Sequence, residues 1–151
     1  MKLKVPSAII HGHQNLLAEL KEVIAIGGKT GEKAKFLGET MAPHFEKEEE
    51  YALPPLGLLL NLSKGNWEVS TQEAIKMADN LELRLIEMMK DHANISKVMR
   101  ELKLLAEEEN HFVAKQFIKN LVQHMELEDE VLYPTTILIG NYLKKVSTEL
   151  N

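Results

Sequence analysis

Two stretches of this sequence place a histidine four residues ahead of a glutamate, a combination that can bind metal. Residues 44–54 read HFEKEEEYALP, and residues 124–134 read HMELEDEVLYP. On a helix, residues i and i+4 lie about 40° apart around the axis and about 6 Å apart along it. An imidazole and a carboxylate at this spacing can therefore reach one metal ion or a pair of ions. One such pair arises easily by chance, whereas two copies inside a duplicated pattern do not.

A second shared element lies upstream of each copy. His13 begins the segment HQNL and His92 begins HANI, so both follow the form His-x-Asn-(Leu/Ile). His13 precedes the histidine of the first copy by 31 residues, and His92 precedes that of the second by 32. This internal repeat predicts two helix hairpins, each offering one histidine from its first helix and a His–Glu pair from its second. The candidate metal ligands are His13, His44, Glu48, His92, His124 and Glu128.

The mixture of donors indicates which metals would suit such a site. Two hairpins packed face to face would supply four imidazoles and two carboxylates to the core of a helical bundle. The carboxylates could bridge two ions while each ion keeps two imidazoles, and coordination positions would remain open. Imidazole with carboxylate suits iron better than magnesium or calcium, which prefer oxygen ligands alone. Zinc and manganese stay open as alternatives.

The rest of the sequence shows the periodicity of helices, and no segment alternates convincingly at the period of a β-strand. Leu16, Leu20 and Ile24, for example, recur at helical spacing and are followed by Gly27, a residue typical of helix ends. We therefore predict an all-α protein: an antiparallel up-down four-helix bundle with a short C-terminal extra helix, in a single domain over residues 1–151. The expected helices span about 7–26, 31–53, 71–107 and 111–133, with a bundle core of about 8–134 and the C-terminal helix at 135–150.

Prolines and small polar residues predict where these helices begin, bend and end. Ser70 or Thr71 is expected to cap the third helix, and Asn110 the fourth. Pro43 lies inside the second helical pattern and predicts a kink or a local break there. Pro134 is expected to break the fourth helix and so to separate it from the C-terminal one.

The composition limits the class of protein. Of the 151 residues, 44% are hydrophobic and 27% charged, which suits one packed domain. The net charge is −5 and the lysines are scattered, so no nucleic-acid partner is expected. The lack of cysteine excludes disulfides, iron–sulfur clusters and thiolate zinc sites. The most apolar run, residues 53–62, is too short for a membrane span and the N-terminus lacks the features of a signal peptide, so we expect a soluble cytoplasmic protein without a membrane partner.

The order His … His-xxx-Glu … His … His-xxx-Glu resembles the hemerythrin-like, or HHE cation-binding, family over roughly residues 8–134. The resemblance implies a four-helix bundle with a non-haem di-iron centre, its two iron ions bridged by an oxo or hydroxo group. The implied terminal ligands are the four histidines named above, and the implied bridging ligands are Glu48 and Glu128. Because Asp129 lies next to Glu128, it is an alternative bridge, although the symmetry of the repeat favours Glu128.

The sequence departs from the oxygen-carrying hemerythrins, which have a His-xxx-His motif in the third helix. Four residues before and after His92 lie Met88 and Ser96, so a fifth imidazole is missing. This difference favours a more open site that binds or senses dioxygen, nitric oxide or peroxide, or that handles iron. The chain also resembles the di-iron bundle of iron-centre repair proteins, without their additional cysteine-containing domain.

Three functions remain open at this stage: a binding or sensing protein, an enzyme acting on peroxide or nitric oxide or in iron-centre repair, and a bundle that zinc merely stabilises. The expected partner is a small diatomic or peroxide ligand, and the chain could be a monomer or a homodimer.

The neighbours of the candidate ligands carry further expectations. Asp129 and Glu49 are candidates for outer partners of the ligands, whereas Asp91 is expected to be solvated. Tyr133 is expected to serve packing, with a hydrogen bond near the site as the alternative, and His11 is expected to lie outside the site. His111 is expected at the surface or as a helix cap.

Overall fold

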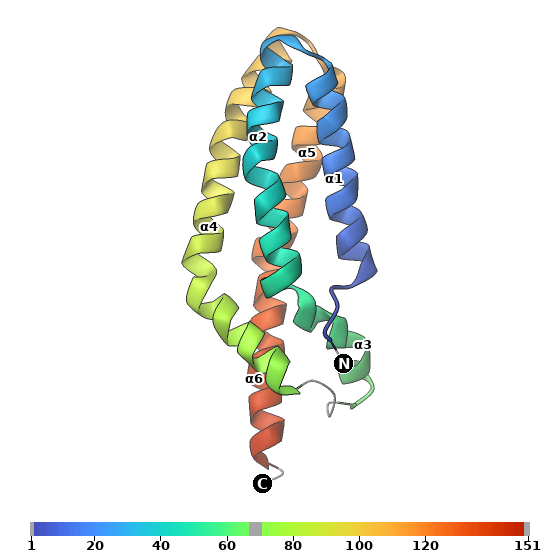
Figure 1. The fold of residues 1–151 in the computed structure, drawn as a ribbon, viewed down its shortest axis with the longest axis vertical. Helices are drawn as coiled ribbons and strands as arrows, with labels where there is room; N and C mark the ends of the chain where they lie inside the picture. The colour runs from blue at the N-terminus through green and yellow to red at the C-terminus, as the bar shows by residue number, and fades with distance from the viewer. Residues whose placement is uncertain (1, 67–70, 150–151) are drawn as a thin grey trace.

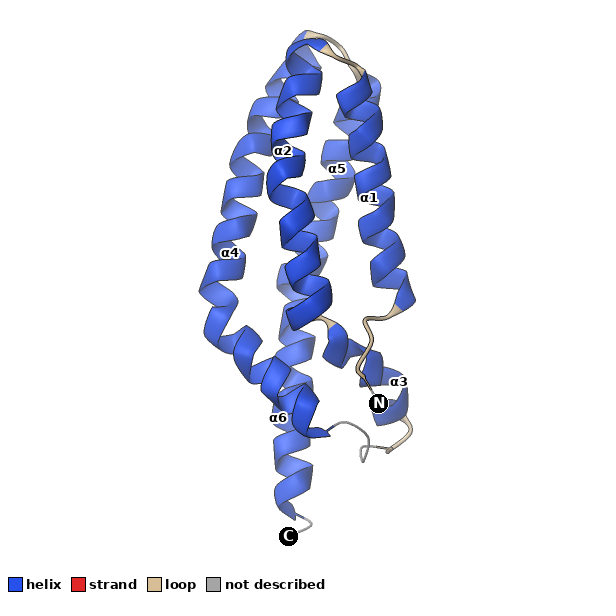
Figure 2. Cartoon of the chain, viewed as in Figure 1, coloured by secondary structure: helices blue, strands red, loops and turns tan. Residues whose placement is uncertain are grey.

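The computed structural model describes residues 2–66 and 71–149, and every regular element within these ranges is a helix (Figure 2). The prediction of an all-α protein is confirmed. No helix in this part of the chain is long and apolar enough to cross a membrane. In chain order the elements are α1 (Ser7–Ala25), α2 (Gly28–Lys47), η1 (Glu48–Ala52), η2 (Pro54–Leu58), α3 (Leu59–Ser63), α4 (Thr71–Glu108), α5 (Phe112–Leu127), η3 (Glu128–Leu132) and α6 (Tyr133–Glu149).

The four long helices pack side by side into a bundle (Figure 1). Helix α1 contacts α2 and α5, and α4 contacts the same two helices from the other side. Helix α6 extends beyond the end of α5 and packs against α4. Residues from both halves of the sequence therefore meet along the interior of the bundle.

Two short connections close the end of the bundle drawn at the top of Figure 1. Between α1 and α2, Gly27 and Gly28 have φ angles of 76° and 58°, a region that glycine enters without steric cost. Between α4 and α5, Asn110 has a φ of 54°. Asn110 therefore ends the turn after α4, while His111 is the residue that precedes α5. The expectation that Asn110 caps the fourth helix was wrong, and the proposed cap at Ser70 lies outside the described residues.

Both copies of the repeat contain a wider, π-helical turn directly after the His-xxx-Glu pattern. In η1 the Leu53 N–H donates to the Glu48 carbonyl, and in η3 the Tyr133 N–H donates to the Glu128 carbonyl, each across five residues. Pro54 or Pro134 follows each turn. The expected break at Pro134 is absent, because the chain passes from η3 directly into α6.

Pro43 also fails to interrupt the helix that contains it. Helix α2 is continuous from Gly28 to Lys47 and includes Pro43, which lies on the exposed side. The local break predicted before His44 is therefore not observed.

The buried apolar side chains form two clusters, one on each side of the candidate ligands. The first fills the bundle between α1, α2, α4 and α5, and the second joins η1, η2, the first half of α4 and α6. On α4, His92 lies between Met88 of the second cluster and Ile95 of the first. The polar donors therefore form a layer between two apolar regions, where water is scarce.

Candidate metal centre

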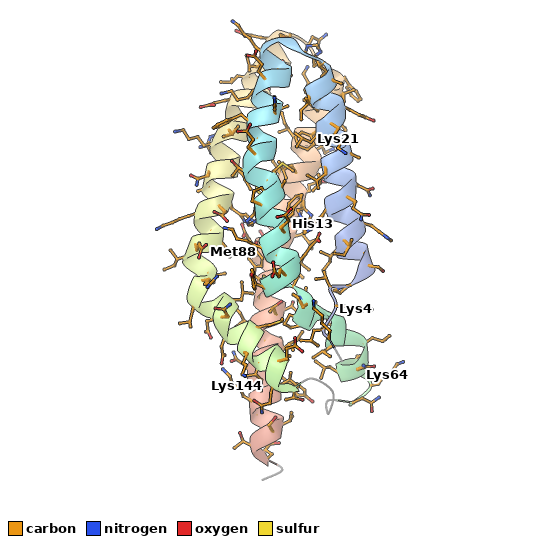
Figure 3. The ribbon with its side chains drawn as sticks, viewed as in Figure 1. Lys4, His13, Lys21, Lys64, Met88 and Lys144 are labelled. Carbon is orange, nitrogen blue, oxygen red and sulfur yellow. The ribbon has the colours of Figure 1, made fainter. Side chains whose placement is uncertain are left out.

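The structure brings all six candidate ligands together in this layer, although they come from six different elements. They form two overlapping groups in which the donor atoms lie within 4.8 Å of one another. Figure 3 labels one of these ligands, His13 on α1, and also Met88 on α4, which lies four residues before His92. Both groups contain the two carboxylates, and each adds a different pair of histidines. The first group is His13, Glu48, His124 and Glu128, and the second is His44, Glu48, His92 and Glu128.

Each carboxylate spans the two groups with its two oxygens. Glu48 Oε2 lies 3.4 Å from His13 Nε2, and Glu48 Oε1 lies 3.3 Å from His44 Nε2. Glu128 Oε1 contacts His124 Nε2, and Glu128 Oε2 lies 3.5 Å from His92 Nε2. An ion in either group would therefore meet one oxygen of each carboxylate, which is the arrangement that bridging between two ions requires.

Three of the imidazoles are held from behind by a carboxylate. His13 Nδ1 donates to Glu49 at 2.7 Å and His92 Nδ1 donates to Asp129 at 2.8 Å. His44 Nδ1 donates to Asp91 at 3.2 Å. Because an ionised carboxylate only accepts hydrogen bonds, Nδ1 carries a ring proton and Nε2 faces the interior, where the Nε2 atoms of His44 and His92 lie 2.9 Å apart. Metal-binding histidines are commonly oriented in this way.

Several donor atoms of the site have no hydrogen-bond partner, although they are buried. Among the described residues, these include His13 Nε2, Glu48 Oε2, His124 Nε2 and Glu128 Oε1. All four belong to the first group, and their mutual contacts are close without having hydrogen-bond geometry. Burying polar atoms without partners costs free energy, so a bound cation would satisfy them. The donor set therefore fits a metal ion.

Burial and neighbouring side chains shift the pKa values of several groups in the layer. Although burial alone would raise the pKa of Glu48, the close imidazoles of His13 and His44 and the hydroxyl of Tyr133 lower it to about 2. Burial lowers the pKa of His124 to about 4, and the nearby His13 adds to this effect. Burial likewise lowers the pKa of His92. For His44, burial is outweighed by Glu48 and Asp91, and the pKa rises.

The hydroxyl of Tyr133 contacts the second group, whereas the sequence had favoured packing over a hydrogen bond near the site. Its side chain is 1% exposed, and its hydroxyl donates to Glu48 Oε1 and lies 3.0 Å from Glu128 Oε2. Burial and the charge of Glu48 raise the pKa of this phenol, so it is neutral in the metal-free protein. The only available signal was its place directly after the second His-xxx-Glu pattern, which does not separate packing from contact with the site.

The structure also corrects one expectation about a neighbouring carboxylate and places two further histidines. Asp91, expected to be solvated, contacts both His44 and Lys47, and the distance to Lys47 Nζ is 2.6 Å. This interaction joins α4 to α2 and could not be read from local spacing. His11 is exposed, and His111 contacts Glu109 at the surface.

The chain was compared with models of known protein families. The model described as hemerythrin HHE cation binding domain matches residues 6–136, which include every residue of both groups. No curated protein and no solved structure matches the chain.

Proposed function

Because the chain belongs to the hemerythrin HHE cation-binding family, we propose that its core binds two iron ions and that these bind a small ligand such as dioxygen, nitric oxide or peroxide. One observation carries the proposal: two groups of buried donors share both carboxylates and differ in their histidines. His13 and His124 would hold one ion, and His44 and His92 the other. Glu48 and Glu128 would bridge them.

The protein would contribute orientation and exclusion of water. The carboxylates behind His13, His44 and His92 fix the rings with Nε2 facing inward, so little reorganisation is needed when an ion binds. The apolar clusters on both sides limit the access of water to the layer. Iron would supply redox chemistry and open coordination positions, which four imidazoles and two carboxylates do not fill.

A groove between α4 and α6 offers a small ligand a route toward the site. It has a volume of about 520 Å³, and apolar side chains such as Leu85, Met89 and Ile137 line most of it. Asp129 and Tyr133 lie on its polar side, next to His92. An apolar approach suits dioxygen and nitric oxide, which are uncharged.

The antiparallel up-down order of the four long helices, with α6 as the C-terminal addition, is part of this proposal. The ring of contacts through α1, α2, α4 and α5 supports it. We also propose that residues 1–151 act as a single domain, since the site needs helices from both halves of the chain.

Metal analysis of the protein purified from its native source tests the proposal directly. We expect two iron ions per chain and a visible absorption spectrum that changes when dioxygen or nitric oxide is added. A His92→Ala variant should lose iron, whereas His111→Ala, which removes a surface imidazole, should retain it. Two zinc ions without iron would instead indicate a structural site. Peroxide or nitric oxide consumption that disappears in His92→Ala would indicate an enzyme.

A further inference from the structure

Tyr133 breaks the symmetry of the repeat at the site. It follows Glu128 by five residues, and the residue at the same distance after Glu48 is Leu53. Both side chains are buried, but Leu53 belongs wholly to the apolar cluster, whereas the hydroxyl of Tyr133 reaches the carboxylates. The two halves of the centre are therefore chemically different.

The Tyr133 oxygen lies among all four donors of the second group. It donates to Glu48 Oε1 and lies 3.0 Å from Glu128 Oε2. It is also 3.3 Å from His92 Nε2 and 3.5 Å from His44 Nε2. These four atoms are the inward-facing donor atoms of that group. The phenol oxygen therefore faces the same position in the interior as they do.

Within the described part of the chain, no hydroxyl forms a hydrogen bond with the donor atoms of the first group. These four atoms are without hydrogen-bond partners, and the aromatic ring of Phe45 borders the group. The Phe45 ring stacks on His13 at 4.1 Å between centroids and contacts the His124 ring edge-on at 5.5 Å. One half of the centre is thus bordered by an apolar ring and the other by a phenol.

We propose that the Tyr133 oxygen is a fifth ligand of the ion held by His44 and His92, so that the two ions of the centre are inequivalent. This inference rests on the proposed metal centre. The phenol proton would leave to solvent when the oxygen binds the ion. Phenolate oxygen is a recognised ligand of ferric iron and would add one negative charge to those of Glu48 and Glu128. Tyr133 would fill the half of the centre in which the sequence lacks a fifth imidazole.

A competing role for Tyr133 is to donate a hydrogen bond to the bridging carboxylates without touching the ion. The two roles differ in spectroscopy, because a phenolate bound to ferric iron produces a charge-transfer band in the visible range and a hydrogen-bonded phenol does not. The chain offers matched controls, since its other two tyrosines, Tyr51 and Tyr142, are 46% and 43% exposed.

The experiment compares the full chain loaded with ferric iron in four forms: wild type, Tyr133→Phe, Tyr51→Phe and Tyr142→Phe. The wild type should show the charge-transfer band, and resonance Raman excitation within it should enhance tyrosine ring vibrations. Tyr133→Phe should lose both signals and bind iron on the order of tenfold more weakly, while both controls keep them. The phenylalanine ring can retain the packing of Tyr133 against His92, where the ring centroids lie 5.7 Å apart, and circular dichroism checks the fold.

Two results would overturn the inference, and they are distinguishable. If wild type binds two iron ions without tyrosine vibrations in its visible bands, Tyr133 is not a ligand and the proposed function stands. If wild type binds no iron, the proposed function fails and the inference fails with it. Because the decisive spectrum is that of the wild type, the test does not depend on the variant folding.

Discussion

At the scale of single residues, the site contains two kinds of side chain. Some present donor atoms to the interior, and others are carboxylates that accept hydrogen bonds from the histidine rings and orient them. Asp129 Oδ1 accepts a hydrogen bond from His92 Nδ1 at 2.8 Å, whereas both oxygens of Glu128 face imidazole Nε2 atoms. The two adjacent carboxylates of the second repeat therefore point in different directions. Glu128 faces the interior of both donor groups, and Asp129 holds the His92 ring from behind.

Replacing the two carboxylates separately should distinguish these roles. Glu128→Gln removes a donor shared by both groups, so we expect it to abolish binding of at least one of the two ions. Asp129→Asn should keep both ions and weaken their binding by about 10- to 100-fold, which is typical when the partner of a ligand is removed. Glu126→Gln, an exposed position on α5, is the control. Elemental analysis and competition titration measure the outcome; equal losses in both variants would contradict the assignment.

The buried carboxylate of Glu48 should make the stability of the metal-free protein depend on pH. Its pKa is lowered to about 2 in the folded state, compared with about 4.5 for an unperturbed glutamate. A lowered pKa stabilises the folded state above the unfolded value, and this contribution is lost as the pH falls from about 5 toward 2. The difference in unfolding free energy between wild type and Glu48→Gln should therefore shrink over that range, measured by denaturant titration after chelation. Glu46→Gln, at an exposed position, should show no such trend.

The six candidate ligands could be found from sequence because each has a counterpart in the other half of the repeat. Tyr133 could not, since its counterpart is Leu53 and the repeat therefore argues for packing. Asp91 was also missed, because its contacts with His44 and Lys47 cross from one helix to another. A repeat predicts what its two copies share and gives no information about the residues that distinguish them.

At the scale of elements, the π-helical turns explain why the fourth helix continues through proline. In an α-helix, the proline ring collides with the carbonyl of residue i−4 and removes one hydrogen bond. The turn at Glu128–Leu132 is wider, and its closing bond runs from the Tyr133 N–H, one residue before Pro134. The break predicted at Pro134 was therefore wrong: the turn widens from Glu128, and the helix continues through Pro134 into α6.

The close contact between α4 and α6 leads to a prediction about helix packing. A Cβ atom added to Gly140 would lie 2.3 Å from the Cβ of Ala78, which is closer than real side chains approach. Gly140→Ala should therefore destabilise the protein by about 1–3 kcal/mol through overpacking. Denaturant unfolding monitored by circular dichroism measures the change.

Gly12→Ala is the matched control for this substitution, since Gly12 is a helical glycine with no atom within 4 Å of the added Cβ. It should stabilise the protein by about 0.5–1 kcal/mol, because alanine favours helix over glycine. Adding Ala78→Gly to Gly140→Ala should recover part of the loss. If Gly140→Ala is as favourable as Gly12→Ala, the close approach of α4 and α6 is wrong.

At the scale of the whole molecule, the polar layer divides the buried interior into two apolar clusters. His13 stacks on Phe45 of the first cluster, and Tyr133 belongs to the second. The helical pattern of the sequence predicted the bundle, because apolar periodicity and breaks alone suffice for that. It could not predict the second cluster, which depends on α6 continuing from η3 and packing along α4.

The donors of this layer come from both halves of the chain, so an ion bound there would stabilise the whole fold rather than one helix. A ligand that binds only the folded state adds about 2.7 kcal/mol at a free concentration of about 100 times its Kd, which is roughly 5–10 °C in Tm for a domain of this size. We expect ferrous iron, added anaerobically after chelation, to raise the Tm by such an amount. His13→Ala should lose most of this gain, because it removes a donor of the first group, whereas His111→Ala should keep it. Calorimetry with and without metal measures each shift. An equal gain in both variants would mean that the ion binds elsewhere and that the donors are held together by the fold alone.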